Sequence, residues 1–165
     1  MINLELILPE IFLSLSIMFL LILGVFKKNS SKLVQNISLI VLLITSVIIF
    51  NETLSIKEIT LFNGSIVIDY LSSFMKIVTL LAAFSSLVIS TNYLKTFKIF
   101  KIEYPILILS SVLGMMIMIS SNDLITFYMG LELQSLALYV LATFNRDQLK
   151  SSEAGLKYLK LSTQF

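Results

Sequence analysis

The sequence predicts an all-α fold, a polytopic bundle of transmembrane helices whose N-terminus lies outside the membrane. Of the 165 residues, 57% are hydrophobic and only 13% are charged, and the mean hydropathy is +0.96. A soluble domain carries about 25% charged residues. The apolar residues gather in runs long enough to cross a hydrocarbon core of ~30 Å, and the basic residues gather in alternate loops. We therefore expect residues 1–165 to form a single membrane domain.

Hydropathy predicts five spans. The first should be retained, because residues 1–10 hold two acids and no base, whereas a signal peptide begins with positive charge. The second and third are apolar runs, interrupted by charges only at Asp69 and Lys76. Pro105 suits the first turn of the fourth. Asn122 and Asp123 suit a cap for the fifth, which should form a helical hairpin with the fourth. The spans cover about residues 4–26, 33–50, 66–90, 105–120 and 124–144.

A truncated sixth helix is predicted after the fifth span. Ser151, Ser152 and Glu153 read as a cap that leads into a helix at 154–161. A spanning helix needs about 20 apolar residues, so this segment is too short to cross a bilayer.

Loop charges predict the orientation. Ten of the twelve basic residues fall on one side of the bundle, and the other side holds mainly acids. By the positive-inside rule, the N-terminus faces out and the opposite ends face the cytoplasm or matrix. The ten are Lys27, Lys28, Lys32, Lys95, Lys98, Lys101, Arg146, Lys150, Lys157 and Lys160.

Composition also excludes several kinds of chemistry. The chain has no Cys and no His, so iron–sulfur clusters, haem held by His, and zinc sites are excluded within it. We expect it to bind no cofactor of its own. The net charge of +2 is small and dispersed, which argues against nucleic acid as a partner. The expected surroundings are the lipid bilayer.

Glu132 is the principal candidate site residue. It lies nine residues after Asp123, or ~13 Å of helix rise, near the middle of the fifth span. An acid at that depth must be paired, hydrated or protonated, and by default marks an ion or proton pathway. A polar stripe at helical spacing accompanies it: Tyr128, Ser135, Tyr139 and Thr143. The alternative is that Glu132 only holds helices together.

Two lysines are secondary candidates. Lys76 lies well inside the third span and is a candidate counter-ion, which would pair with Glu132 across the bundle or take part in a pathway. Lys157 lies at the entry of the sixth helix. Its structural alternative is a surface ion pair with Glu153, four residues earlier.

Four stretches resemble one protein family. Leu-Glu-Leu-Gln-Ser-Leu at 131–136 and Glu-Ala-Gly-Leu-Lys-Tyr at 153–158 are the most specific. Leu-Pro-Glu-Ile-Phe at 8–12 and Asp69-Tyr with Phe-Met-Lys76 extend the similarity over most of the chain. They resemble the subunit N family of NADH–quinone oxidoreductase, the respiratory complex I, whose mitochondrial counterpart is subunit 2.

The resemblance implies the N-terminal part of a proton-translocating, antiporter-like membrane-arm subunit without a redox centre. In that family, the glutamate matching Glu132 couples to a lysine on a later helix, and Lys157 matches a lysine at the start of the sixth helix. NAD and quinone would be used by the whole complex, whose other membrane-arm subunits are the implied partners. The implied location is a bacterial or mitochondrial inner membrane.

The resemblance also implies missing parts. The family's subunits contain inverted helical repeats, and this chain ends within the first. It is expected to be an incomplete subunit: the product of a frameshifted or truncated gene, a fragment, or one half of a split subunit that a separate chain completes. Two alternatives remain open: a subunit of a multisubunit cation/proton antiporter, and a nonfunctional or structural membrane fragment.

Overall fold

The computed structural model describes residues 7–26, 31–53, 59–96, 101–144 and 149–162. Five of its helices are long and apolar enough to cross a membrane, which confirms the predicted helical bundle. The elements, in order, are α1 (Leu8–Phe26), α2 (Ser31–Thr53), β1 (Ile59–Leu61), the 3₁₀ turn η2 (Phe62–Gly64), β2 (Ile66–Ile68), α3 (Tyr70–Thr96), α4 (Glu103–Ser120), α5 (Leu124–Ala142) and α6 (Leu149–Ser162).

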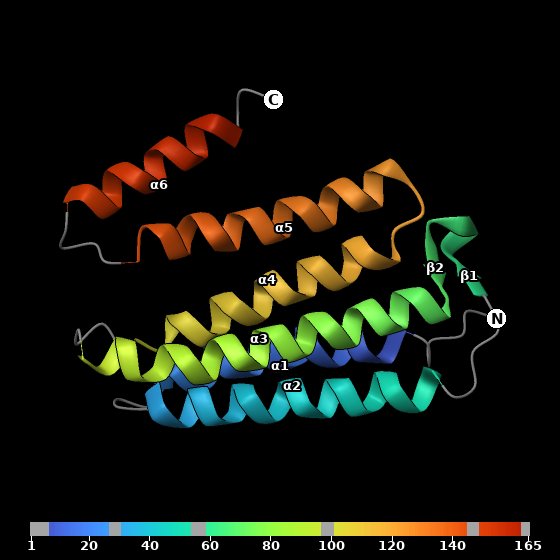
Figure 1. Ribbon diagram of the computed structural model, residues 1–165, viewed down its shortest axis with the longest axis horizontal. Coiled ribbons are helices and arrows are strands. Elements are labelled where there is room, and N and C mark those ends of the chain that lie inside the picture. The colour runs from blue at the N-terminus through green and yellow to red at the C-terminus, as the bar shows by residue number, and fades with distance from the viewer. Residues whose placement is uncertain (1–6, 27–30, 54–58, 97–100, 145–148, 163–165) are drawn as a thin grey trace.

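Helix α4 occupies the centre of the bundle. It packs against α1 and α3 on one side and against α5 on the other, while α2 packs against α1 and α3 (Figure 1). Large aliphatic side chains from the first four helices fill the core between them. The most deeply buried are Leu13, Leu20, Leu42, Leu80, Leu87, Leu109 and Met116.

Two glycines bring α4 and α5 into backbone contact. A Cβ atom added to Gly114 would lie 2.7 Å from the Gln134 nitrogen and 2.8 Å from the Gly130 carbonyl oxygen. One added to Gly130 would lie 2.9 Å from the Gly114 oxygen. Small residues at such crossings let helices approach closely inside membranes. This contact fixes the position of α5, and hence of Glu132, relative to the core.

The predicted start of the third span is wrong. Residues 66–68 form strand β2, which pairs antiparallel with β1, and the helix begins only at Tyr70. Ile66, Val67 and Ile68 are β-branched and suit a strand. Asn63 and Gly64 adopt positive φ angles of 55° and 93° in the connecting turn, a conformation that these two residue types favour.

The hairpin is attached to the link between α4 and α5. The Asn122 side chain donates a hydrogen bond of 2.7 Å to the Gly64 carbonyl, and its backbone N–H donates one of 2.9 Å to Ser65. Ile66 also forms a β-bridge with Ser121. The hairpin therefore lies at the end of the bundle where α1, α3 and α5 begin (Figure 1).

The sixth helix also differs from the prediction. Helix α6 starts at Leu149, so residues 151–153 lie inside it rather than capping it. The Ser151 hydroxyl donates to the Ala142 carbonyl at the end of α5, 2.9 Å away, and thus serves the preceding helix. The fourteen residues of α6 rise about 21 Å, which is short of a ~30 Å hydrocarbon core. Helix α5 itself ends at Ala142 rather than at residue 144.

Candidate functional site

Glu132 lies near the middle of α5, as predicted. Asp123 caps the start of the helix, because its carboxylate accepts a 2.7 Å hydrogen bond from the Thr126 backbone N–H. Hydrogen bonds from the Thr126 side chain and backbone hold the pKa of Asp123 below its ordinary value of 3.8. Glu132 is half-buried and is the only Asp, Glu, Lys or Arg of α5. The cap fixes where α5 begins, and the glycine contact fixes where α5 packs against α4. Together they set the position of Glu132 in the bundle.

The serine and threonine hydroxyl groups of the polar stripe bond to the backbone instead of to the carboxylate. The Ser135 hydroxyl donates to the Glu132 carbonyl oxygen at 3.0 Å, and the Thr143 hydroxyl donates to the carbonyl of Val140 at 3.1 Å. Tyr139 packs against Tyr158 of α6, with 5.8 Å between ring centroids. Within the described residues, no hydrogen bond or ion pair reaches the Glu132 carboxylate. The Glu132 carboxylate can therefore bind water or a group from outside the described residues.

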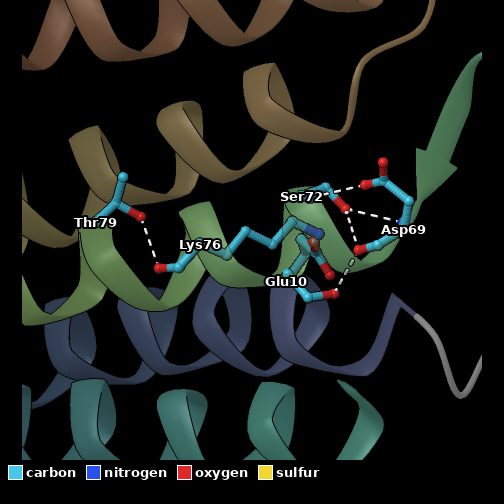
Figure 2. A network of polar contacts seen from close by, with 6 residues as sticks. Glu10, Asp69, Ser72, Lys76 and Thr79 are labelled. Carbon is cyan, nitrogen blue, oxygen red and sulfur yellow. Dashed lines mark hydrogen bonds and ion pairs between the residues drawn. The ribbon is translucent and has the colours of Figure 1, made fainter. Parts of the chain in front are cut away.

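Lys76 pairs with Glu10, not with Glu132. Its Nζ lies 2.5 Å from Oε1 of Glu10, and only 3% of the Lys76 side chain is exposed. Figure 2 shows the Lys76 side chain running along α3 to meet Glu10 from α1. The sequence-based pairing with Glu132 is therefore wrong. The reason is that the Lys76 side chain reaches from α3 to Glu10 of α1, while α5 packs mainly on α4.

Figure 2 shows one further acid, Asp69, near this pair. Asp69 caps α3: its Oδ1 accepts a 2.7 Å hydrogen bond from the Ser72 N–H, and the Ser72 hydroxyl accepts one of 3.0 Å from the Asp69 N–H. The Ser72 backbone bond, followed by the Ser72 side chain, holds the pKa of Asp69 below its ordinary value of 3.8.

Within the described residues, Lys157 forms the surface ion pair with Glu153 that is the structural alternative to a role in proton transfer. Its Nζ lies 3.0 Å from Oε1 of Glu153, four residues earlier on α6, and both side chains are largely exposed. A surface pair of this kind contributes little to stability. The structure therefore places Lys157 on the surface of α6 and leaves its role in proton transfer as a prediction.

Sequence reasoning missed Glu10 as the partner of the buried Lys76. Glu10 was assigned to the aqueous face because it stands at the end of an apolar run. The sequence did indicate that Glu10 could be buried, because it lies in the first turn of α1 and no other charged residue follows it in that helix. No group of three or more His, Cys, Asp or Glu among the described residues could hold a metal ion.

Comparison with known proteins gives concordant matches. The family model of the NADH:quinone oxidoreductase/Mrp antiporter transmembrane region matches residues 121–164. NADH-quinone oxidoreductase subunit N of Pelagibacter ubique is 69% identical over 160 residues, covering 97% of this chain and 34% of that protein. The subunit N of Paramagnetospirillum magneticum is 45% identical over 158 residues, covering 95% of this chain and 32% of that protein.

A solved structure shares the fold. A chain from the respiratory complex I of Thermus thermophilus with bound aureothin superimposes with a TM-score of 0.77 at 23% identity, covering 94% of this chain and 33% of its own length. This chain thus spans about a third of the length of the relatives that it matches. With its five apolar helices it is an integral membrane protein. On these sequence matches, the chain belongs to the subunit N family of NADH–quinone oxidoreductase.

Proposed function

We propose that this chain is part of the membrane arm of an NADH–quinone oxidoreductase and couples electron transfer from NADH to quinone to the translocation of protons. The observation that carries the proposal is the 69% identity, over nearly the whole chain, to a protein named as subunit N of that enzyme. Electron transfer itself belongs to other subunits, because this chain has no Cys or His to hold a metal redox centre.

Within this function, Glu132 is the residue that takes up and releases a proton. It is the single acid of an apolar helix, half-buried at mid-span. An isolated carboxylate at this depth is costly when ionised. Its proton affinity is therefore sensitive to any charge that approaches or leaves. A lysine on a neighbouring element would provide such a charge, and Lys76 does not, because Glu10 holds it.

The proposed partners are the other membrane-arm subunits, lipid, and the helices that make up the remaining length of the relatives. Those helices would come from a continuation of this chain or from a separate polypeptide. The proposed location is the inner membrane of a bacterium or a mitochondrion. NAD and quinone would be used by the assembled complex.

Purification tests the assignment. The tagged chain, extracted with mild detergent from membranes of cells that express it naturally, should carry NADH-dependent quinone reduction. The matched family model also covers antiporters, which supports one alternative function. Cation-dependent proton exchange by the purified material, without any NADH-dependent quinone reduction, would contradict the proposal and favour a cation/proton antiporter.

A further inference from the structure

The helix that carries Glu132 meets the core at a contact between two backbones. Helix α5 packs along α4 (Figure 1). A Cβ atom added to Gly114 would lie 2.7 Å from the nitrogen and 3.2 Å from the Cα of Gln134, both main-chain atoms of α5. A Cβ atom added to Gly130 would lie 2.9 Å from the backbone nitrogen of Met118, on α4. Because main chain meets main chain here, the two glycines set the distance between α4 and this turn of α5.

Glu132 lies on the opposite side of that turn. An α-helix advances by about 100° per residue, so Glu132 is about 160° around the helix from both Gly130 and Gln134. Burial agrees with this geometry. Gly130 and Ala137 are the buried residues of α5 and share the side that faces α4, whereas Tyr128, one turn before Glu132, is 61% exposed. A movement of α5 away from α4 therefore carries Glu132 outward from the core.

Both ends of α5 are held to the rest of the bundle. Before its start, the side chain and the backbone N–H of Asn122 donate hydrogen bonds to the carbonyls of Gly64 and Ser65. After its end, the Phe144 ring packs edge-on against Tyr104 of α4, with 5.7 Å between ring centroids. The glycine contact lies between these two attachments. A displacement at the contact must therefore be taken up in the middle of α5, where Glu132 lies.

A methyl group added at this contact would displace the Glu132 carboxylate. Non-bonded atoms are normally ~3.5–4.0 Å apart. A Cβ atom at Gly114, 2.7 Å from rigid backbone, therefore requires α4 and α5 to part by about 1 Å. A carboxylate exchanges a proton only with a group within hydrogen-bond reach, ~2.6–3.2 Å between heavy atoms, or through one water. The displacement is larger than the width of that range, ~0.6 Å, so it should impair proton transfer.

We propose that Gly114 and Gly130 are positioning residues for proton transfer by Glu132. Their contact holds α5 close enough to α4 to keep the carboxylate within hydrogen-bond reach of the groups with which it exchanges protons. Neither glycine takes part in the transfer, in which a proton binds to and leaves a Glu132 carboxylate oxygen. The inference rests on the proposed function of Glu132, and its test must separate the two claims.

The number of protons translocated per NADH oxidised, measured for the assembled enzyme in vesicles, tests this role. Gly114→Ala should lower the ratio toward the value of Glu132→Gln while subunit composition stays intact. The double variant Glu132→Gln/Gly114→Ala should have the ratio of Glu132→Gln alone, because Gly114 acts only through that carboxylate. A merely structural effect would lower the ratio further in the double variant. Gly24→Ala, whose added Cβ meets only side-chain atoms of Ile102, is the matched control and should keep the wild-type ratio.

Gly130→Ala provides a second variant with the same expected loss. Gly114→Ala/Gly130→Ala should lose little more than either single variant, because one displacement makes room for both methyl groups. An unchanged ratio in the assembled glycine variants, where Glu132→Gln lowers it, would overturn the positioning role and leave the proposed function intact. An unchanged ratio in Glu132→Gln would overturn both. Failure of both single glycine variants to assemble, with Gly24→Ala assembled, would assign the contact to folding alone and also overturn the positioning role.

Discussion

Lys76 brings a positive charge into the helical bundle, and Glu10 compensates it. The two residues lie 66 positions apart in the sequence. The depth of Lys76 was readable from the apolar residues around it. Its partner was not, because the pairing depends on how the helices are arranged around α3 and on how far the Lys76 side chain reaches, and helical periodicity specifies neither.

Removing one member of the pair should cost more than removing both. Lys76→Met leaves Glu10 either ionised without a counter-charge or obliged to take up a proton, and should destabilise the protein by about 3–5 kcal/mol. The double variant Lys76→Met/Glu10→Gln should lose less. The measurement is the free energy of unfolding in mixed micelles. Equal losses in the two variants would show that the pair does not compensate charge.

Asp69 should make a pH-dependent contribution to stability. Replacing this cap by Ala should cost about 1 kcal/mol at pH 7. Because hydrogen bonds from Ser72 lower the pKa of Asp69 in the folded protein, ionised Asp69 stabilises the fold at pH values above the unfolded pKa. That contribution is lost as the pH falls through the folded pKa. The free energies of unfolding of Asp69→Ala and wild type should therefore become equal in acid. A difference between them that stays constant down to low pH would argue against this role of ionised Asp69.

At the scale of elements, the contact between α4 and α5 depends on glycine. Gly114→Ala places a methyl group against rigid backbone, 2.7 Å from the Gln134 nitrogen, and should cost about 1–3 kcal/mol through strain. Gly24→Ala is the matched control, since its Cβ would meet only side-chain atoms of Ile102, the Cγ2 at 2.7 Å and the Cβ at 3.9 Å. That side chain can move aside, so the control should unfold closer to wild type.

The five apolar helices followed from the sequence, whereas the hairpin did not. Hydropathy averages over windows longer than a three-residue strand, so Ile66, Val67 and Ile68 were merged with the helix that follows them. The Asn63-Gly64 pair was a readable turn signal. The start of α6 was misplaced because Ser151 bonds to the end of α5, a tertiary contact that a local capping pattern does not reveal.

At the scale of the whole molecule, the charge distribution predicts the orientation in the membrane. The chain contains no Cys, so a single introduced cysteine reports the side of the membrane on which it lies. Thr60→Cys in β1 and Lys32→Cys in α2 lie at opposite ends of the bundle, and both positions are exposed. In intact cells, a membrane-impermeant maleimide should label Thr60→Cys, and should label Lys32→Cys only after permeabilisation. The reverse pattern would invert the orientation.

The candidate site was only partly readable from the sequence. The position of Glu132 on α5 was predicted, because one acid in an apolar helix stands out in any hydropathy profile. Its environment was not. Its position relative to the core follows from the glycine contact between α4 and α5. The hydroxyl groups of Ser135 and Thr143 donate to backbone carbonyls, as serine and threonine in helices commonly do.

The central claim is that Glu132 carries protons for an NADH–quinone oxidoreductase. The most direct measurement is the number of protons translocated per NADH oxidised by the assembled enzyme in vesicles, for wild type, Glu132→Gln and the surface control Glu153→Gln. We predict that Glu132→Gln lowers this ratio while subunit composition stays intact, and that the control keeps the wild-type value. An unchanged ratio in fully assembled Glu132→Gln enzyme would contradict the claim and leave Glu132 a structural residue.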